Sequence, residues 1–493
     1  MKYEYLSIQA LPAWARLNGV SLSGVAFRRF SAEEGTDRGS AIVCSADKGS
    51  TIGPVEDDGS SCVLLTVQSD LVLSLQAVED YAKSDPYLRE VLEAVGEMGR
   101  TARGAILIFL LIHLSYSSPD FTSGSHKIGV SNAWTEYLKF MPASVPLPTF
   151  YSAEERELLR GTSLKPALDA KLASLDREFE HLRQCTEGIA WCQEYWWDEE
   201  KGTLRLDDWK YVDALYRSRS VDLPGSGHSM VPCIDMANHA SEGTVKALYE
   251  TDASGKAVLQ LRSGKTLNAG EEVTISYGAS KSAAEMIFSY GFLEDDRVGA
   301  GNMVVPFDIS DDDPLKLAKK MFHSNTSGIH VSAADSTTTI VDWSRSLVWW
   351  ASVNEEDGLD FKVLQTTDGD KELRAIWKGE DVDTPAKIGD ILAAESLWEV
   401  FQLRAVVTII TLLESQLAEL HGIDEIIADF RRDEAMLKTL FDPDVFRLLC
   451  RFRVLEAELL KRGIDELFSR RTLLLRSETV IDYLKSQQED DFS

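Results

Sequence analysis

Hydrophobic and polar residues alternate in different ways along successive parts of the 493-residue chain. Up to about residue 70, short β-type runs alternate with turn residues, and the clearest are 24–27, 38–43 and 63–67. From about 70 to 220 the period becomes helical, and residues 105–114 are apolar on every side, as in a helix buried in a core. The pattern therefore predicts an α+β fold in which a helical part follows the first strands.

Capping signals mark where several predicted elements begin and end. Ser152 with Glu155, and Ser282 with Glu285, have the spacing of a capping box, and Gly161 and Gly291 are placed to end the helices that follow. A helical pattern also runs over 172–196, and the pattern at 134–142 predicts a helix that ends at a proline. Strands are predicted at 245–250 and 257–262, joined by a turn at 254–255.

The chain changes character again after residue 300. An acidic linker is expected at 308–314, followed by a Ser/Thr/Asp-rich stretch over 325–385 with β-type islands such as 346–350. Long amphipathic helices are then predicted, one from 397 that ends at Gly422 and one that starts at Asp442-Pro443. Their apolar faces read more readily as core than as a partner-binding surface. The acidic tail 487–493 is expected to be disordered.

Composition narrows the function classes. The net charge is −29, which argues against direct binding of nucleic acid and favours a basic protein partner, although acidity also simply keeps a protein soluble. The six cysteines contain no C-x-x-C pair, and there are only eight histidines, so no metal site is expected. No sustained apolar stretch opens the chain, and the run 105–114 is half a bilayer span. We therefore expect no membrane association, and a cytoplasmic or possibly also nuclear location.

Two short runs carry the candidate chemistry. The first, 231–240, begins apolar and ends in the polar pair Asn238-His239. The second has a Gly-containing turn at 270–272, then an alternating β-branched strand that ends at Tyr277-Gly278. Each residue alone also has a purely structural explanation. Asn238-His239 could form a turn, Tyr277 could end a strand, Arg219 and Asp235 could form an ion pair, and Phe292 could belong to the core. Their order along one chain is much less common.

That order resembles the SET-domain methyltransferases, in the branch typified by the plant Rubisco large-subunit lysine methyltransferase. The resemblance implies a SET-type β fold of small sheets over residues 1–300, with the helical insertion at about 70–220, followed by a mainly helical substrate-binding domain over 301–493. Its motif-bearing part runs from about Arg38 to Phe292. The family usually shows G-x-G before its arginine, whereas Asp37-Arg38-Gly39 has one glycine there. The chain also lacks the Cys-rich zinc cluster of histone-type SET enzymes.

The resemblance also implies roles for individual residues, with S-adenosylmethionine as the methyl donor. Tyr277 is the expected catalytic residue, which orients the amine beside the transferred methyl. The cofactor is expected to contact six residues: Arg219 near its carboxylate, Asp235 beside it or at the lysine channel, Asn238 and His239 at its adenine and amino-acid ends, Tyr277 at the methyl, and Phe292 at the adenine edge. A reacting lysine must first lose its proton, which burial and a neighbouring cation favour.

Three function classes remain open on this evidence. The first is a protein-lysine N-methyltransferase that acts on a non-histone protein, such as a ribosomal protein or translation factor. The second is a protein-histidine methyltransferase of the same fold, and the third is an inactive SET fold that serves as a binding module. Asn238-His239 and Tyr277 argue against the third, and Ser220 after Arg219 argues against the second. We expect a monomer whose partner is a basic protein substrate with an accessible lysine.

Overall fold

The computed structural model describes residues 1–30, 39–45, 51–52, 62–122, 129–199, 202–323, 328–333, 339–344, 346–365 and 371–490. The chain divides into two compact units, each of them discontinuous in sequence. Unit 1 comprises Met1–Phe150, Leu168–Ser280 and Ile287–Glu294; unit 2 comprises Tyr151–Ala167, Lys281–Met286 and Asp295–Ser493. The domain boundary expected at residue 300 stays a prediction.

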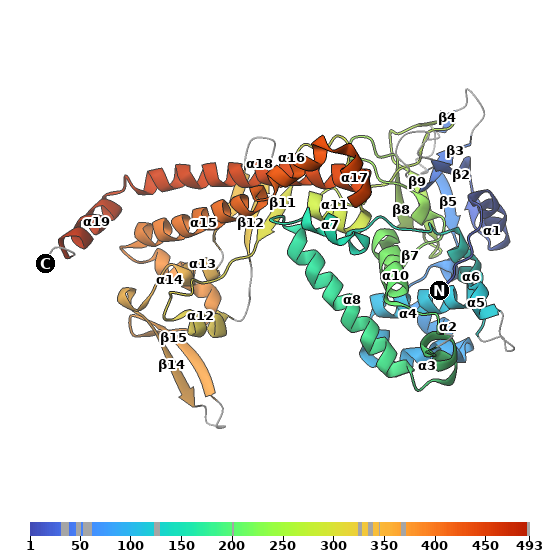
Figure 1. The fold of residues 1–493 in the computed structure, drawn as a ribbon, viewed down its shortest axis with the longest axis horizontal. Coiled ribbons are helices and arrows are strands. Elements are labelled where there is room, and N and C mark those ends of the chain that lie inside the picture. Colours follow the sequence, from blue (N-terminus) through green and yellow to red (C-terminus); the bar gives the residue numbers. More distant parts are fainter. Residues whose placement is uncertain are drawn as a thin grey trace. The chain divides into compact units, whose positions relative to one another are not determined.

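Unit 1 contains the small antiparallel sheets expected of the fold (Figure 1). A four-stranded sheet has the order β1 (Ser21–Leu22), β5 (Val63–Val67), β9 (Ala257–Leu261) and β8 (Ala247–Thr251). Three two-stranded sheets join β2 (Val25–Phe30) to β3 (Gly39–Cys44), β6 (Ser220–Leu223) to β7 (Gly227–Met230), and β10 (Leu267–Asn268) to β4 (Thr51–Ile52). The strands predicted before residue 70 and around the 254–255 turn are confirmed.

One predicted strand, the β-branched run before Tyr277, is not a regular strand. Its successive residues pair with three different segments: the Val273 amide donates to the Ile42 carbonyl at 2.8 Å, the Ala247 amide to the Thr274 carbonyl at 2.9 Å, and the Ile275 amide to the Asn238 carbonyl at 2.9 Å. Because no single neighbour runs alongside it, only isolated bridges form. The run instead ties β3, β8 and the Asn238-His239 segment together.

The helical insertion surrounds one fully buried helix, as its sequence predicts. In α4 (Ala102–Ser117), every residue from Gly104 onward is buried. Around it lie α2 (Leu75–Ser84), α3 (Pro86–Ala94) and α10 (Leu206–Arg219), as Figure 1 shows. The other helices with residues in unit 1 are α1 (Leu11–Leu17), α5 (Pro119–Thr122), α6 (Ala133–Tyr137), α8 (Leu164–Thr186), α9 (Ala190–Cys192) and α11 (Ala283–Tyr290).

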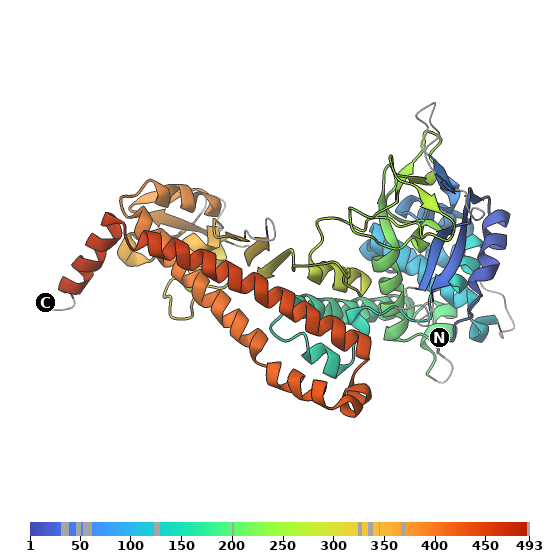
Figure 2. The same cartoon turned by 90° about the horizontal axis from the view of Figure 1, so that it is seen from above.

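Two long helices, α15 (Trp398–His421) and α18 (Pro443–Leu474), form the core of unit 2 and run side by side in Figures 1 and 2. Both were predicted, including the Asp442 cap of α18, whose side chain accepts from the Asp444 amide at 2.8 Å. Two three-stranded sheets complete the unit: β11 (Asn302–Val305), β12 (Ile329–Ala333), β13 (Thr339–Asp342); and β14 (Leu359–Gln365), β15 (Lys371–Trp377), β16 (Glu380–Val382). Its shorter helices are α12 (Lys316–His323), α13 (Ser346–Ala351), α14 (Ile388–Ala393), α16 (Asp424–Arg432), α17 (Glu434–Leu440) and α19 (Glu478–Asp490).

Two local predictions in unit 2 are wrong. The β-type island at 346–350 is the helix α13, in which Leu347 to Trp350 are all buried, so tertiary packing overrides the local β propensity. The tail expected to be disordered is helical as far as Asp490, because α19 continues through it, while residues 491–493 lie outside the described residues.

The segment Tyr151–Ala167 belongs to unit 2 although it lies within the predicted insertion. It contains α7 (Ala153–Glu157), opened by the predicted capping box of Ser152 and Glu155. At Gly161 the backbone has φ +75°, and a Cβ there would lie 2.5 Å from the Leu420 Cα, so only glycine fits. The glycine predicted as a helix stop is thus also the point where this segment touches α15.

Within the described part of the chain, one helical stretch, Trp398–Arg432, is long and apolar enough to cross a membrane by length and composition alone. Apolar residues of α15 within it, among them Phe401, Ile409 and Leu413, are buried in unit 2. A core helix of a globular domain passes the same test.

Candidate active site

The Asn238-His239 pair is positioned by a parallel bridge with the run that leads to Tyr277. The Ile275 amide donates to the Asn238 carbonyl at 2.9 Å, and the Ala240 amide donates to the Ile275 carbonyl at 3.1 Å. In a parallel bridge of this kind, the residue between the two bonded neighbours directs its own N–H and carbonyl to the opposite side. Here that residue is His239. The backbone N–H and carbonyl of His239 therefore point away from Ile275.

The His239 side chain links Tyr277 to the segment after α11. Its Nδ1 accepts a hydrogen bond from the Tyr277 backbone amide at 3.0 Å, and its Nε2 lies 3.3 Å from Glu294 Oε1. Because Nδ1 accepts, the proton of the neutral ring lies on Nε2, which donates to Glu294. The imidazole thus holds the backbone of Tyr277 in place.

Tyr277 lies at the centre of an aromatic group. Its hydroxyl donates to the Ala237 carbonyl at 2.9 Å. The Tyr290 ring packs on it with centroids 4.4 Å apart, His239 lies at 5.2 Å and Phe292 at 6.4 Å. Burial raises the pKa of the Tyr277 phenol above its ordinary value, and only the charge of Arg219 opposes this. The hydroxyl therefore stays protonated and can act as a hydrogen-bonding group, not as a standing base.

Arg219 and Asp235 form a buried ion pair. Arg219 Nη1 donates to the Asp235 carbonyl at 3.0 Å, lies 3.3 Å from its Oδ2, and lies 3.7 Å from the Met236 sulfur. Burial raises the pKa of the Asp235 carboxyl, against the opposing effects of Arg219 and of a hydrogen bond from Tyr137. All these arginine contacts use Nη1; within the described residues no protein group bonds Nη2, which leaves that side of the guanidinium fork to an anion.

Asn238 and Phe292 complete the predicted set. The Asn238 side-chain nitrogen Nδ2 donates to Glu272 Oε1 at 2.7 Å, and no donor among the described residues reaches its side-chain oxygen Oδ1. Phe292 lies 6.0 Å from His239 and 6.4 Å from Tyr290 between ring centroids. It stands one residue after Gly291, where φ is +80° and a Cβ would lie 2.3 Å from the Pro146 carbonyl oxygen. The glycine stop of α11 therefore sets where Phe292 emerges.

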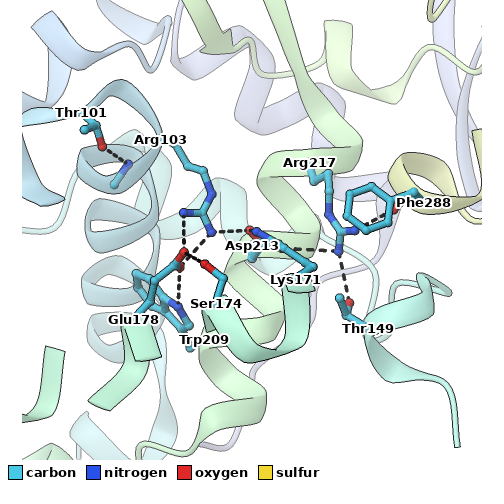
Figure 3. Close-up of polar contacts among 11 residues, drawn as sticks. Thr101, Arg103, Thr149, Lys171, Ser174, Glu178, Trp209, Asp213, Arg217 and Phe288 are labelled. Atoms are coloured by element: carbon cyan, nitrogen blue, oxygen red, sulfur yellow. Dashed lines mark hydrogen bonds and ion pairs between the residues drawn. The ribbon is translucent and has the colours of Figure 1, made fainter. Parts of the chain in front are cut away.

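An ionic network surrounds the buried carboxylate of Asp213 on α10 (Figure 3). Asp213 accepts from Arg103 and from Lys171, both at 2.7 Å, and pairs with Arg217 at 3.4 Å. The other end of Arg217 donates to the Phe288 carbonyl at 2.7 Å and lies over the Phe288 ring at 4.5 Å. The last turn of α11 is thereby fastened to α10, the helix that ends at Arg219.

Sequence reasoning did not find several residues that the structure places at the site. Glu272 lies within the predicted turn at 270–272, to which no role was assigned, and Arg217, two residues before Arg219, carried no signal of its own. Glu294 and Tyr137 had no sequence signal, since Tyr137 is 98 positions away from the Asp235 carboxylate that it touches. Arg38, where the motif-bearing part of the sequence begins, lies outside the described residues. Across the residues that the structure describes, no cluster of three His, Cys, Asp or Glu side chains could hold a metal ion.

Several known proteins are similar to this chain in sequence or in fold. A fission yeast protein, "SET domain-containing protein 8" of Schizosaccharomyces pombe, is 28% identical over 340 residues, which is 68% of this chain and 71% of that protein. The chloroplastic "Ribulose-1,5 bisphosphate carboxylase/oxygenase large subunit N-methyltransferase" of Nicotiana tabacum is 27% identical over 169 residues, a third of either chain. No family model matches the chain.

The solved structure of the SET domain of LSMT bound to lysine and AdoHcy superposes over 95% of this chain and 92% of its own, with a TM-score of 0.63 and 18% identity. In sequence and in fold, this chain is therefore similar to SET-domain proteins of the Rubisco large-subunit methyltransferase class. The predicted fold, a SET-type β fold with a helical insertion and a helical C-terminal region, is confirmed.

The six predicted site residues all lie in unit 1 and form two groups, which the chain between Asp235 and Asn238 joins. Direct contacts link Arg219 to Asp235, and His239 to both Tyr277 and Phe292, while Asn238 adjoins His239 in the chain. Their catalytic and cofactor-binding roles stay predictions. The ion pair that the sequence suggested between Arg219 and Asp235 is present. If Arg219 binds a ligand, it does so while it also holds Asp235.

Proposed function

We propose that the protein is an S-adenosylmethionine-dependent protein-lysine N-methyltransferase. The observation that carries the proposal is the Tyr277 hydroxyl, which stays protonated and is held against the Ala237 carbonyl inside a group of aromatic rings. Relatives of the same class are named as protein N-methyltransferases, and the Tyr277 arrangement gives this chain the group that such a transfer needs.

The donor groups of the site fit the proposed cofactor. Arg219 offers Nη2 to a carboxylate, and a guanidinium fork suits a planar anion. The His239 backbone N–H and carbonyl, which face away from Ile275, can pair with the polar edge of an adenine, and Phe292 supplies an aromatic surface beside them. When bound, S-adenosylmethionine supplies an electrophilic methyl group on a cationic sulfonium.

The residues of the site prepare an amine to react. A lysine with a pKa of about 10.4 must lose its proton before it can accept a methyl group. The aromatic group of Tyr277, Tyr290 and Phe292 disfavours a charged amine by desolvation. The Tyr277 hydroxyl and the neighbouring carbonyls orient the neutral amine for an in-line approach, which lowers the barrier without any covalent intermediate.

We further propose a substrate class and a setting. The net charge of −29 favours a basic, Lys-rich protein, and a non-histone target such as a ribosomal protein or translation factor fits it. The same charge opposes direct nucleic-acid binding. The proposed protein is a monomer. It works in the cytoplasm, or also in the nucleus, and does not associate with membranes.

A single experiment tests the activity. The purified protein is incubated with methyl-labelled S-adenosylmethionine and a heat-inactivated total protein extract, and mass spectrometry locates the labelled residues. We expect methyl groups on lysine of one or a few proteins, lost in Tyr277→Phe. Label on histidine would replace the proposal with the histidine alternative, and a protein that binds S-adenosylmethionine but never transfers its methyl group would be an inactive module.

A further inference from the structure

Tyr137 occupies a special place beside the site. It is the last residue of α6, its side chain is fully buried, and its hydroxyl makes two hydrogen bonds to the turn before Asn238. The hydroxyl accepts from the Cys233 amide at 2.7 Å and donates to Asp235 Oδ1. It therefore satisfies one backbone donor and one carboxylate at once.

The position of this hydroxyl is fixed by the rings around it. Trp14 packs against the Tyr137 ring with centroids 4.7 Å apart, and Trp134 packs edge-on at 5.3 Å. Trp14 also donates to the Ala133 carbonyl at 3.2 Å, at the start of α6. The ring therefore cannot move without disturbing the core of unit 1, and it forms a firm anchor for the turn.

The turn that Tyr137 holds is strained. Cys233 has φ +69°, a conformation that residues with a side chain rarely adopt; among the described non-glycine residues only Lys378 shares a positive φ. Such a conformation persists only where its surroundings hold it, and such sites are frequently functional. The hydrogen bond from the Cys233 amide to the Tyr137 hydroxyl is one of the contacts that stabilise this conformation.

The turn leads directly to the carbonyl that receives the Tyr277 hydroxyl. The Ala237 amide donates to the Ile234 carbonyl at 2.9 Å, so Ala237 is placed by the turn itself. Its carbonyl then accepts from Tyr277 at 2.9 Å, and the Asp235 carbonyl accepts from Arg219 at 3.0 Å. The direction of both carbonyls depends on the conformation of residues 233–235.

We infer that Tyr137 is a positioning residue for methyl transfer: its hydroxyl fixes the 233–235 turn and, through the Ala237 carbonyl, the direction of the Tyr277 hydroxyl. This inference rests on the proposed function. Tyr137 itself does not touch the reacting atoms. Its loss should therefore slow turnover while leaving cofactor binding and the fold largely intact.

The test begins with Tyr137→Phe, which removes the hydroxyl and keeps the packed ring. Tyr116→Phe is the matched control, because Tyr116 is also buried and bonds a carboxylate, Asp85, at 3.3 Å away from the site. Turnover on the protein extract should fall tenfold or more in Tyr137→Phe, with the dissociation constant for S-adenosylhomocysteine, measured by calorimetry, changed less than threefold. Tyr116→Phe should lower only the melting temperature.

A double-mutant cycle separates positioning from general stability. If Tyr137 acts through Asp235, Tyr137→Phe should slow turnover less in an Asp235→Asn background than in the wild type, whereas independent effects would multiply. Should Tyr137→Phe not fold, Asp235→Asn alone is expected to lower turnover per folded molecule. Full turnover in either single variant, or multiplying effects, would overturn the inference and leave the proposed function standing. A wild type without any methyl transfer would instead overturn the proposed function.

Discussion

At the scale of single residues, the site depends on where a few polar atoms are pointed. Tyr277 is held by two bonds of different kinds, its amide to His239 Nδ1 and its hydroxyl to the Ala237 carbonyl. The first fixes the backbone and the second fixes the reactive end of the side chain. A substitution can therefore remove the second and spare the first.

Tyr277→Phe makes that separation. It removes the bond to Ala237 and keeps the ring among Tyr290, Phe292 and His239, so the free energy of unfolding should fall by only about 1 kcal/mol. Turnover should fall roughly a hundredfold or more, the scale expected when a positioned polar group is lost from a transition state. Denaturant unfolding and turnover measured on one preparation check both. A lowered stability with an unchanged rate per folded molecule would make Tyr277 a structural residue only.

The substitution Asn238→Ala tests whether Asn238 binds the cofactor. In the wild type, S-adenosylmethionine at a hundred times its dissociation constant should add about 2.7 kcal/mol to the free energy of unfolding. Asn238→Ala should lose most of this gain, because it removes the carbonyl oxygen offered to the ligand and also the amide that holds Glu272. Thermal melting with and without cofactor measures the gain. The exposed Lys387→Ala should keep it, and an Asn238→Ala variant that also keeps it would remove Asn238 from the cofactor site.

At the scale of elements, α10 supports the site at two points. Its last residue, Arg219, reaches Asp235, while Arg217 reaches back to the Phe288 carbonyl in the last turn of α11. Figure 3 shows Arg217 between Asp213 and Phe288, with Arg103 on the far side of the carboxylate. Tyr290 ends the turn of α11 that Arg217 holds, and Phe292 follows two residues later, so this turn places both rings beside Tyr277.

Arg217→Met tests the link between these helices. It leaves the Phe288 carbonyl without its side-chain donor and removes one of three cations from buried Asp213, so unit 1 should lose roughly 2–4 kcal/mol of stability. Urea unfolding followed by circular dichroism measures the loss. Arg374→Met removes an arginine that also has two carboxylate partners, but at the surface of β15, and should change little. Equal effects of the two changes would show that the buried network does not stabilise the unit.

At the scale of the whole molecule, unit 2 is completed by a segment from far earlier in the chain. Buried Arg453 on α18 donates to the Leu158 carbonyl at 3.0 Å and to the Arg160 carbonyl at 2.6 Å. Fully buried Glu456 accepts from the Ser163 amide at 2.9 Å and from its hydroxyl. A fragment that begins at residue 301 would leave both of these buried charged side chains without those partners.

Glu456 should also make the stability of unit 2 depend on pH. Burial raises its pKa from 4.5 to about 7. The folded state therefore holds a proton that the unfolded state has released between these values, and the free energy of unfolding falls as pH rises from 4.5 to about 7. Glu456→Gln removes the charge; its side-chain oxygen can still accept from the Ser163 amide, while its NH2 group donates to the Ser163 hydroxyl instead of accepting from it. It should therefore be the more stable protein at pH 8, by roughly 1–3 kcal/mol, and equal to the wild type near pH 4.5.

Urea unfolding at pH 5 and pH 8 checks this difference. Glu458→Gln is the control, since Glu458 lies two residues along the same helix and is exposed. Stability differences that are the same at both pH values would contradict the assignment of a raised pKa to Glu456.

The sequence by itself determined several features that depend on neighbouring residues. The capping boxes at Ser152 and Ser282, the stop at Gly291, the Asp442 cap and the all-apolar helix at 105–114 follow from backbone hydrogen bonding and side-chain burial within one element. The order of Arg219, Asn238-His239, Tyr277 and Phe292 was enough to indicate the family. The capping and helix signals involve residues close together in the chain, and the family signal depends only on the order of residues. Both can therefore be recognised without a tertiary structure.

Only the tertiary structure decided how distant segments meet. It divided the run before Tyr277 among three partners, turned 346–351 into a helix by burying it, and assigned residues 151–167 to unit 2. It also brought Tyr137 to Asp235 across 98 positions and Ser163 to Glu456 across 293. No local pattern encodes such pairs, because the free energy that selects them comes from burying both partners together, and that burial exists only in the folded chain.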